Sequence, residues 1–171
     1  MARMVRTVSG LHDAVLVGVV RREQGLLVAP GNPKQLNSLA DVLASRVKMA
    51  VRQPGAGAQM LLETLLGRAG AGPKDLRRLQ PPFLTGPDLA AAVRAGKADC
   101  GVATRAAAKA AGLDFVPLLF ENFDLLTRQR SYFRPSMQAL VGFLRDTRLK
   151  QRAIELGGYD TAPAGLIRFA A

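Results

Sequence analysis

Short apolar runs rich in β-branched residues recur along the first two thirds of this chain, and segments of helical periodicity separate most of them. Residues 14–20 read AVLVGVV, and the charged cluster RREQG separates them from the run LLVA at 26–29. Runs of this length are typical of buried strands, and Gly25 predicts a turn or bulge between the two. The pattern predicts strands near residues 14–20, 26–29, 47–51, 98–102 and 115–119.

Helix start signals lie between these runs. Ser38 and Thr85 are each followed three residues later by an aspartate, a spacing that satisfies two backbone N–H groups at a helix start. We therefore expect a helix over 39–45 and another after Thr85. Thr104 caps the alanine-rich stretch 105–111, and a run of leucines after the turn sequence QPGAGA forms a further helix.

Strands that alternate with helices predict an α/β fold with a mainly parallel or mixed sheet and helices on its faces. The pattern changes from Pro135, where two apolar stripes follow at helical spacing. The stripes are Met137, Leu140, Val141 and Leu144, and then Leu149, Ala153 and Leu156. The C-terminal third is therefore expected to be a pair of helices that carries many arginines.

Composition narrows the class of protein. The chain has 171 residues, of which 49% are hydrophobic and 22% charged, values typical of a folded domain or a small two-lobed unit. The longest apolar run is too short to cross a bilayer and residues 1–10 show no export signal, so a cytoplasmic location is expected. One cysteine and one histidine exclude an internal disulfide and a Cys/His zinc site, and we expect neither metal nor cofactor.

The charge points to anionic partners. Lys and Arg number 24 against 13 Asp and Glu, a formal charge of +11, which favours phosphate, nucleic acid or small oxyanions. There is no run of five basic residues, and aromatics at 5% with no Trp offer few stacking platforms for single-stranded nucleic acid. A basic, solvated surface without a partner remains the alternative.

One turn has the features of an anion cradle. The segment RQPGAGAQ, residues 52–59, lies between a predicted strand and a predicted helix, so the N–H groups of Gly55, Gly57 and Ala58 would meet a positive helix end. It is neither a Walker loop nor a dinucleotide fingerprint, because no Gly-Lys-Ser/Thr follows and Met60 occupies the third glycine position. An ordinary tight turn is the alternative.

Other chemistry-bearing residues have plainer interpretations. His12 and Asp13 lack a nucleophile motif, and Cys100 is most simply a small buried residue. Glu121 and Asp124 would lie on opposite faces of a strand, where salt-bridged or solvated roles are expected. Because no combination of nucleophile, base and oxyanion donors is present, the sequence does not predict an enzyme.

Four segments, in order, carry a resemblance to a known family: RREQGLLVAPGNP at 21–33, RQPGAG at 52–57, AAVRAGKADCG at 91–101 and GLDFVPL at 112–118. Together they resemble the PBP-like domain, a cytoplasmic relative of type 2 periplasmic solute-binding and molybdate-binding proteins. The resemblance covers roughly residues 13–126. In that family the domain is often attached to a helix-turn-helix transcription regulator or to a molybdopterin-biosynthesis protein.

The resemblance implies a fold of the periplasmic-binding-protein type 2 and a ligand-binding domain without catalysis. A small anion or metabolite would sit in a cleft between two lobes, held by helix N-termini and a few side chains. The family's glycine turn reads like GSGTR, whereas Ala56, Ala58 and Gln59 stand here, so mainly backbone donors remain; a Thr-His pair of the family appears as Thr85-Gly86. The expected ligands are molybdate, sulfate, phosphate or the phosphate end of a molybdopterin-like compound. The expected ligand-binding residues are Arg22, Arg52, Gly55, Ala56, Gly57, Ala58, Gln59 and Thr85.

The resemblance also sets an expected domain organisation. Residues 1–12 form an N-terminal arm with no helix-turn-helix pattern, 13–126 the PBP-like lobe, and 127–171 a helical remnant of the other lobe. Because relatives begin with a segment that builds most of the first lobe, apolar surface is expected to be covered by a second copy in a homodimer or by a partner chain. The alternative function is a basic module with a decayed ligand site that binds nucleic acid or protein.

Overall fold

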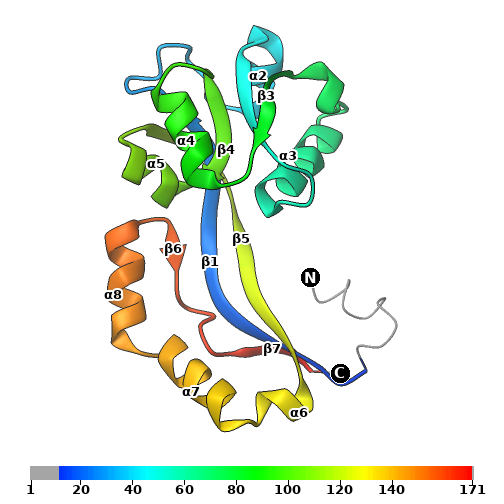
Figure 1. Cartoon of the computed structure of the whole chain (residues 1–171), viewed down its shortest axis with the longest axis vertical. Coiled ribbons are helices and arrows are strands. Elements are labelled where there is room, and N and C mark those ends of the chain that lie inside the picture. Colours follow the sequence, from blue (N-terminus) through cyan, green and yellow to red (C-terminus); the bar gives the residue numbers. More distant parts are fainter. Residues whose placement is uncertain (1–11, 171) are drawn as a thin grey trace. The chain divides into compact units, whose positions relative to one another are not determined.

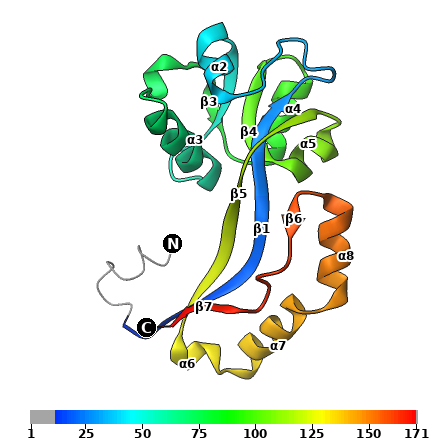
Figure 2. The ribbon, with the colours of Figure 1, turned by 180° about the vertical axis from the view of Figure 1, so that it is seen from behind.

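The computed structural model describes residues 12–170 and divides them into two compact units (Figures 1 and 2). Unit 2 is the continuous stretch Glu23–Leu119, and unit 1 combines the described residues up to Arg22 with those from Phe120 onward. Apart from His12, the N-terminal arm expected over residues 1–12 lies outside the described residues.

Two long strands contribute to both units. They are β1 (Ala14–Val28) and β5 (Asp114–Arg128), each of 15 residues. The domain boundary that the resemblance set at residue 126 falls inside β5.

Unit 2 contains an α/β arrangement between the second part of β1 and the first part of β5. Its further elements are α2 (Leu39–Ser45), β2 (Lys48–Arg52), α3 (Gly57–Arg68), the 3-10 turn η1 (Pro73–Asp75), β3 (Arg77–Phe83), α4 (Gly86–Arg94), β4 (Cys100–Thr104) and α5 (Arg105–Ala111). The strand order is β3-β2-β4-β1-β5, with β2 parallel to β3 and β4 and with β1 antiparallel to β4. The predicted α/β class with a mixed sheet is therefore confirmed.

Alternation along the strands divides the core of unit 2 between two faces. Met49 and Val51 of β2 pack with the apolar residues of α2 and α3, whereas Ala50 between them packs with those of α4 and α5. Figures 1 and 2 show the two pairs of helices on opposite sides of the strands. This is the period of two that a strand buried on both faces requires.

The predicted helix caps are present. The side chains of Ser38, Thr85 and Thr104 each accept a hydrogen bond from a backbone N–H of the first turn that follows. Asp41 completes the first of these caps by accepting from the N–H of Asn37 at 2.9 Å. These helices start where the sequence places them because a cap is a local interaction.

The break predicted at Gly25 is wrong, since β1 runs through it without interruption. Gly25 pairs with Ala103 of β4, and a Cβ at Gly25 would lie 2.2 Å from the carbonyl oxygen of Val116. The glycine therefore serves a close approach of β5 rather than a turn.

Strand β3 is absent from the sequence prediction, because its sequence RRLQPPF contains two prolines. Proline cannot donate to a ladder and is tolerated on edge strands, and β3 ends the strand order of the described sheet.

Unit 1 contains the first part of β1, the second part of β5, and the C-terminal elements. These are α6 (Gln129–Tyr132), α7 (Pro135–Leu144), α8 (Thr147–Leu156), β6 (Tyr159–Asp160) and β7 (Ile167–Ala170). The predicted helical pair is confirmed as α7 and α8, but β6 and β7, which pair antiparallel with β1, were not predicted. A small core joins Val15 and Val17 of β1 to Val141 and Leu144 of α7. No helix among residues 12–170 is both long and apolar enough to span a membrane.

Candidate functional site

The turn between β2 and α3 contains most of the residues that the sequence predicted for ligand binding. Gly55 has a φ of +82°, in the left-handed region that favours glycine. Ala56 is the N-cap residue of α3 and provides no side-chain hydrogen bond. The N–H groups of Gly57 and Ala58 therefore have no acceptor among the described residues, at the positive end of a 12-residue helix.

Gln59 adds a buried polar group to the first turn of α3. Its side chain belongs to a residue that is 6% exposed, and its Nε2 donates to Oε1 of Glu63 at 2.9 Å. Its own Oε1 is buried and has no hydrogen-bond partner in the described structure. A buried acceptor left unpaired costs about 1–3 kcal/mol, so such an atom calls for a donor.

Arg52 links the α3 turn to the segment that precedes α4. Its Nε donates to the carbonyl oxygen of Phe83 at 3.1 Å, and its Nη2 donates to that of Leu84 at 2.6 Å. The backbone N–H of Gln53 donates to the same Phe83 oxygen at 3.2 Å. These bonds hold the Arg52 guanidinium beside both turns, and its Nη1 has no acceptor among the described residues.

Thr85 lies at the start of α4, but its hydroxyl is occupied. It accepts from the N–H of Asp88 at 3.2 Å and donates to the Asp88 carboxylate at 2.5 Å. The side chain is therefore committed to the helix cap.

The sheet topology gives this edge a special position. The chain leaves β2 for its neighbour β3 on one side and then crosses to β4 on the other side. Helices α3 and α4 consequently leave the carboxyl edge for opposite faces of the sheet. In open α/β sheets, ligands bind in the crevice at such a reversal of strand order.

Arg22 belongs to unit 1, whereas the other predicted ligand-binding residues belong to unit 2. Its Nε donates to Oε1 of Glu121, and its guanidinium lies 4.6 Å from the ring centroid of Phe123. The described structure does not bring Arg22 together with the α3 turn within one compact unit. The stacked arginine and phenylalanine have no signal in the sequence, because their contact joins residues about a hundred positions apart.

The other residues considered from the sequence form no catalytic arrangement among the described residues. His12 is exposed in a turn, and Cys100 is fully buried. Burial, with a smaller effect of the Asp99 charge, raises the pKa of the Cys100 thiol to about 12. Glu121 pairs with Arg22, and Asp124 pairs with Arg168 at 3.1 Å, so the salt-bridged interpretation of these carboxylates is confirmed. Residues 12–170 contain no group of three or more His, Cys, Asp or Glu that could hold a metal ion.

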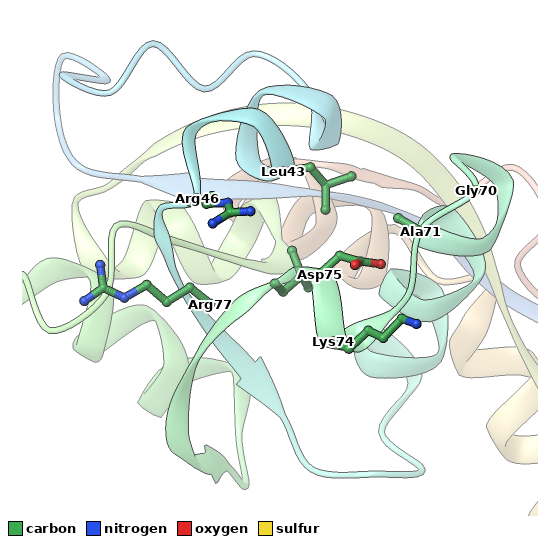
Figure 3. Close-up of a pocket in the computed structure, with 8 residues that line it drawn as sticks. Leu43, Arg46, Gly70, Ala71, Lys74, Asp75 and Arg77 are labelled. Carbon is green, nitrogen blue, oxygen red and sulfur yellow. The ribbon is translucent and has the colours of Figure 1, made fainter.

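A basic cavity that the sequence did not predict lies in unit 2, at the other end of β3. It has a volume of about 680 Å³ and is lined by Arg46, Lys74, Asp75 and Arg77 together with small and apolar residues. Figure 3 shows Lys74 and Arg77 extending to opposite sides of Asp75. The Asp75 carboxylate accepts from the N–H of Gly72 at 2.8 Å. The positive charges are therefore spread along the cavity rather than directed at one point.

Comparison with known families identifies the chain. The model of the PBP superfamily domain matches residues 1–145, which is more than half of the sequence. The chain belongs to this PBP-like family. The curated, uncharacterized protein YvgK of Bacillus subtilis is 30% identical over 152 residues, which cover 89% of this chain and 49% of YvgK. The PBP-like chain thus spans about half the length of the curated relative it matches.

Solved structures confirm the predicted type 2 periplasmic-binding-protein fold. L-phospholactate-bound PEB3 matches with a TM-score of 0.65 and 14% identity, covering 93% of this chain and 75% of PEB3. The regulatory domain of Synechocystis PCC6803 CcmR in complex with 2-PG matches with a TM-score of 0.64 and 10% identity, covering 80% and 68%. The effector-binding domain of QuiR in complex with shikimate matches with a TM-score of 0.63 and 13% identity, covering 84% and 69%. At these identities the likeness establishes the fold of the PBP-like chain and nothing further.

Proposed function

We propose that the PBP-like chain binds a small anion at the start of α3 and does not catalyse a reaction on it. The observation that carries the proposal is the pair of N–H groups at Gly57 and Ala58, which have no described acceptor and lie at the sheet edge beside Arg52. An anion at a helix N-terminus gains about 0.3–1 kcal/mol when exposed and up to about 2 kcal/mol when partly buried. The expected affinity is modest. The proposed site consists of Arg52, Gly55, Ala56, Gly57, Ala58, Gln59 and Thr85.

The residues of the proposed site have different roles. Gly57 and Ala58 donate through the backbone, and the Nη1 of Arg52 adds a charge-assisted donor. The unpaired Oε1 of Gln59 favours a ligand that also carries a protonated oxygen or a hydroxyl group. Thr85 acts through the cap of α4, and Arg22 is left out because its side chain pairs with Glu121.

The proposed ligands are tetrahedral oxyanions, namely molybdate, sulfate or phosphate, or the phosphate end of a molybdopterin-like compound. The fold neighbours that hold L-phospholactate, 2-PG and shikimate support a small-molecule ligand of this size class. Two of these neighbours are described as regulatory or effector-binding domains. We accordingly infer that ligand binding by the PBP-like chain serves regulation of transcription in the cytoplasm, with the chain acting as a homodimer.

The experiment is calorimetric titration with sulfate, phosphate and molybdate, comparing the wild type with Gly57→Pro. Proline is well tolerated at the first position of a helix, and the extended Ala56 (ψ 137°) is compatible with a following proline. The substitution therefore removes one N–H donor while keeping the helix. We expect about tenfold weaker oxyanion binding, the effect of one charge-assisted hydrogen bond.

The matched control is Thr147→Pro, which makes the same change at the first position of α8. The Asp146 cap bonds to the N–H of Arg148 and not to that of Thr147, so the control leaves this cap intact. Oxyanion binding should be unchanged in the control. If the wild type releases or absorbs no heat with any tetrahedral oxyanion at millimolar concentration, the anion site is ruled out and the decayed-site alternative replaces it.

A second candidate function, binding of a nucleic-acid backbone, is favoured by the basic cavity of Arg46, Lys74 and Arg77. Its charges are spread along the cavity (Figure 3), an arrangement that suits a row of phosphates better than one small anion. A salt titration of DNA binding separates the two candidates. Phosphate contacts give a steep loss of affinity with rising salt, and Arg46→Gln with Arg77→Gln should reduce that slope by about two.

A further inference from the structure

A second cavity lies entirely within unit 1, between β1, β5, α8 and β6. Its volume is about 300 Å³, at the lower end of the range for small-molecule pockets. Its walls are mainly apolar, with Val20 from β1 and Leu149 and Leu156 from α8, and two aromatic residues, Phe123 and Tyr159, complete the lining. A cavity of this size and composition suits a compact ligand with one ring.

Two arginines give this apolar cavity a defined charge. Arg22 from β1 and Arg152 from α8 both line it, and the aspartates and glutamates of the described residues do not. Arg152 donates through Nη1 to Glu155 at 2.9 Å, and its side chain is largely exposed. The cavity therefore combines a greasy floor with positive charge.

The geometry of Arg22 decides which anion would fit. Glu121 accepts from the Nε of Arg22, and the face of the guanidinium lies over the Phe123 ring. The two terminal Nη groups have no acceptor among the described residues. A planar guanidinium presents these two groups as parallel donors, the arrangement that pairs with both oxygens of a carboxylate.

We propose that this cavity is a second ligand site of the PBP-like chain, which binds a small aromatic carboxylate. The ring occupies the apolar walls beside Phe123 and Tyr159, and the carboxylate pairs with the Nη groups of Arg22, with Arg152 at the rim. The site shares no residue with the proposed oxyanion site, so it is independent of the proposed function.

The test uses benzoate as the probe, with benzamide and acetate as matched compounds. Benzamide keeps the ring without the charge, and acetate keeps the charge without the ring. NMR titration of the full chain should show benzoate shifting the ring resonances of Tyr159, one of only two tyrosines in the chain. Benzamide and acetate should each bind at least about tenfold more weakly, because each loses one of the two interactions.

Two variants separate the charge from the cavity. Arg22→Gln should weaken benzoate binding at least about tenfold, whereas Arg21→Gln should not, because Arg21 pairs with Asp160 and stacks on Phe120 outside the cavity. Ala153→Leu fills the cavity without changing any charge and should also abolish the Tyr159 shift. Ile154→Ala, at the next and largely exposed position of α8, serves as its control.

Three outcomes overturn the proposal. The first is equal affinity for benzoate and benzamide, and the second is wild-type benzoate binding by folded Arg22→Gln or Ala153→Leu protein. The third is benzoate that shifts resonances of Gly57 and Ala58 while leaving Tyr159 unchanged. This last outcome would place the carboxylate at the oxyanion site, whereas loss of sulfate binding alone would leave the second site intact.

Discussion

Arg22 and Arg52 resemble each other in the sequence, since each stands near the end of an apolar run beside a turn. The structure separates them by their partners. Arg52 donates to two backbone carbonyl oxygens and so joins two loops, whereas Arg22 pairs with a carboxylate and stacks on a ring. An arginine bonded to neutral carbonyls keeps its full charge for a ligand, while an ion pair cancels much of it. Arg52 is therefore the stronger candidate for an oxyanion site.

Cys100 provides a test of burial at the residue scale. We expect the native protein to resist thiol reagents at pH 8, because the side chain is fully buried and its pKa is raised from 9.0 to about 12. The thiolate fraction is then about a thousandfold lower than that of an ordinary cysteine. The measurement is the rate of reaction with a disulfide reagent, with the protein unfolded in urea as the control.

The same pKa shift fixes the sign of a pH effect. The folded state holds the Cys100 proton more tightly than the unfolded state, so this contribution to stability is complete below pH 9 and is lost between pH 9 and about 12. Rapid labelling of the native protein at pH 8 would contradict the burial of this thiol.

At the scale of elements, β1 shows how one glycine can permit strand packing. Gly25 lies in the middle of the second half of β1, where a Cβ would be 2.2 Å from the Val116 oxygen and 2.5 Å from Cζ of Phe115. Backbone atoms of a neighbouring strand cannot move aside cheaply. The charged residues before this glycine are therefore part of a continuous strand.

We expect Gly25→Ala to lower the free energy of unfolding by about 1–3 kcal/mol or more, because it overpacks this contact. Gly67→Ala is the matched control. Gly67 lies inside α3 with no heavy atom within 4 Å of its Cβ position, so alanine there should be neutral or stabilising by up to about 1 kcal/mol. Urea unfolding of both variants measures the difference, and equal stability of Gly25→Ala and the wild type would disprove the close approach.

At the scale of the whole molecule, exposed apolar residues gather in unit 1. Nine of the large hydrophobic residues that are exposed in the described structure belong to it: Phe120, Phe123, Leu126, Phe133, Leu140, Phe143, Ile154, Leu166 and Ile167. Single exposed apolar residues are ordinary, but a concentration of them is typical of a surface that another chain covers. This observation supports the proposed homodimer.

We expect the wild type to be a dimer at micromolar concentration and Phe133→Glu to shift it toward the monomer. Phe133 is 73% exposed in unit 1, and a buried, unpaired carboxylate in an interface is costly. Leu84→Glu is the control, since Leu84 is 70% exposed but belongs to unit 2. Sedimentation analysis distinguishes the species, and a monomeric wild type would count against the dimer.

The sequence by itself determined the local features of this protein. The caps at Ser38, Thr85 and Thr104, the glycine turn before α3 and the α/β class all follow from interactions between residues a few positions apart. The family resemblance was likewise carried by short segments of chain. Of the predicted ligand-binding residues, those from Arg52 to Gln59 came together because they are neighbours in the chain.

Only the tertiary structure decided the features that depend on distant partners. The continuity of β1 through Gly25 depends on β5, and the short strands β6 and β7 exist because β1 offers them an edge. The link from Arg52 to Phe83, the pairing of Arg22 with Glu121 and the cavity beside α8 each join residues more than thirty positions apart. Such contacts leave no periodic signal in the sequence, because the energy that selects them is gained only once the chain has closed the loops between them.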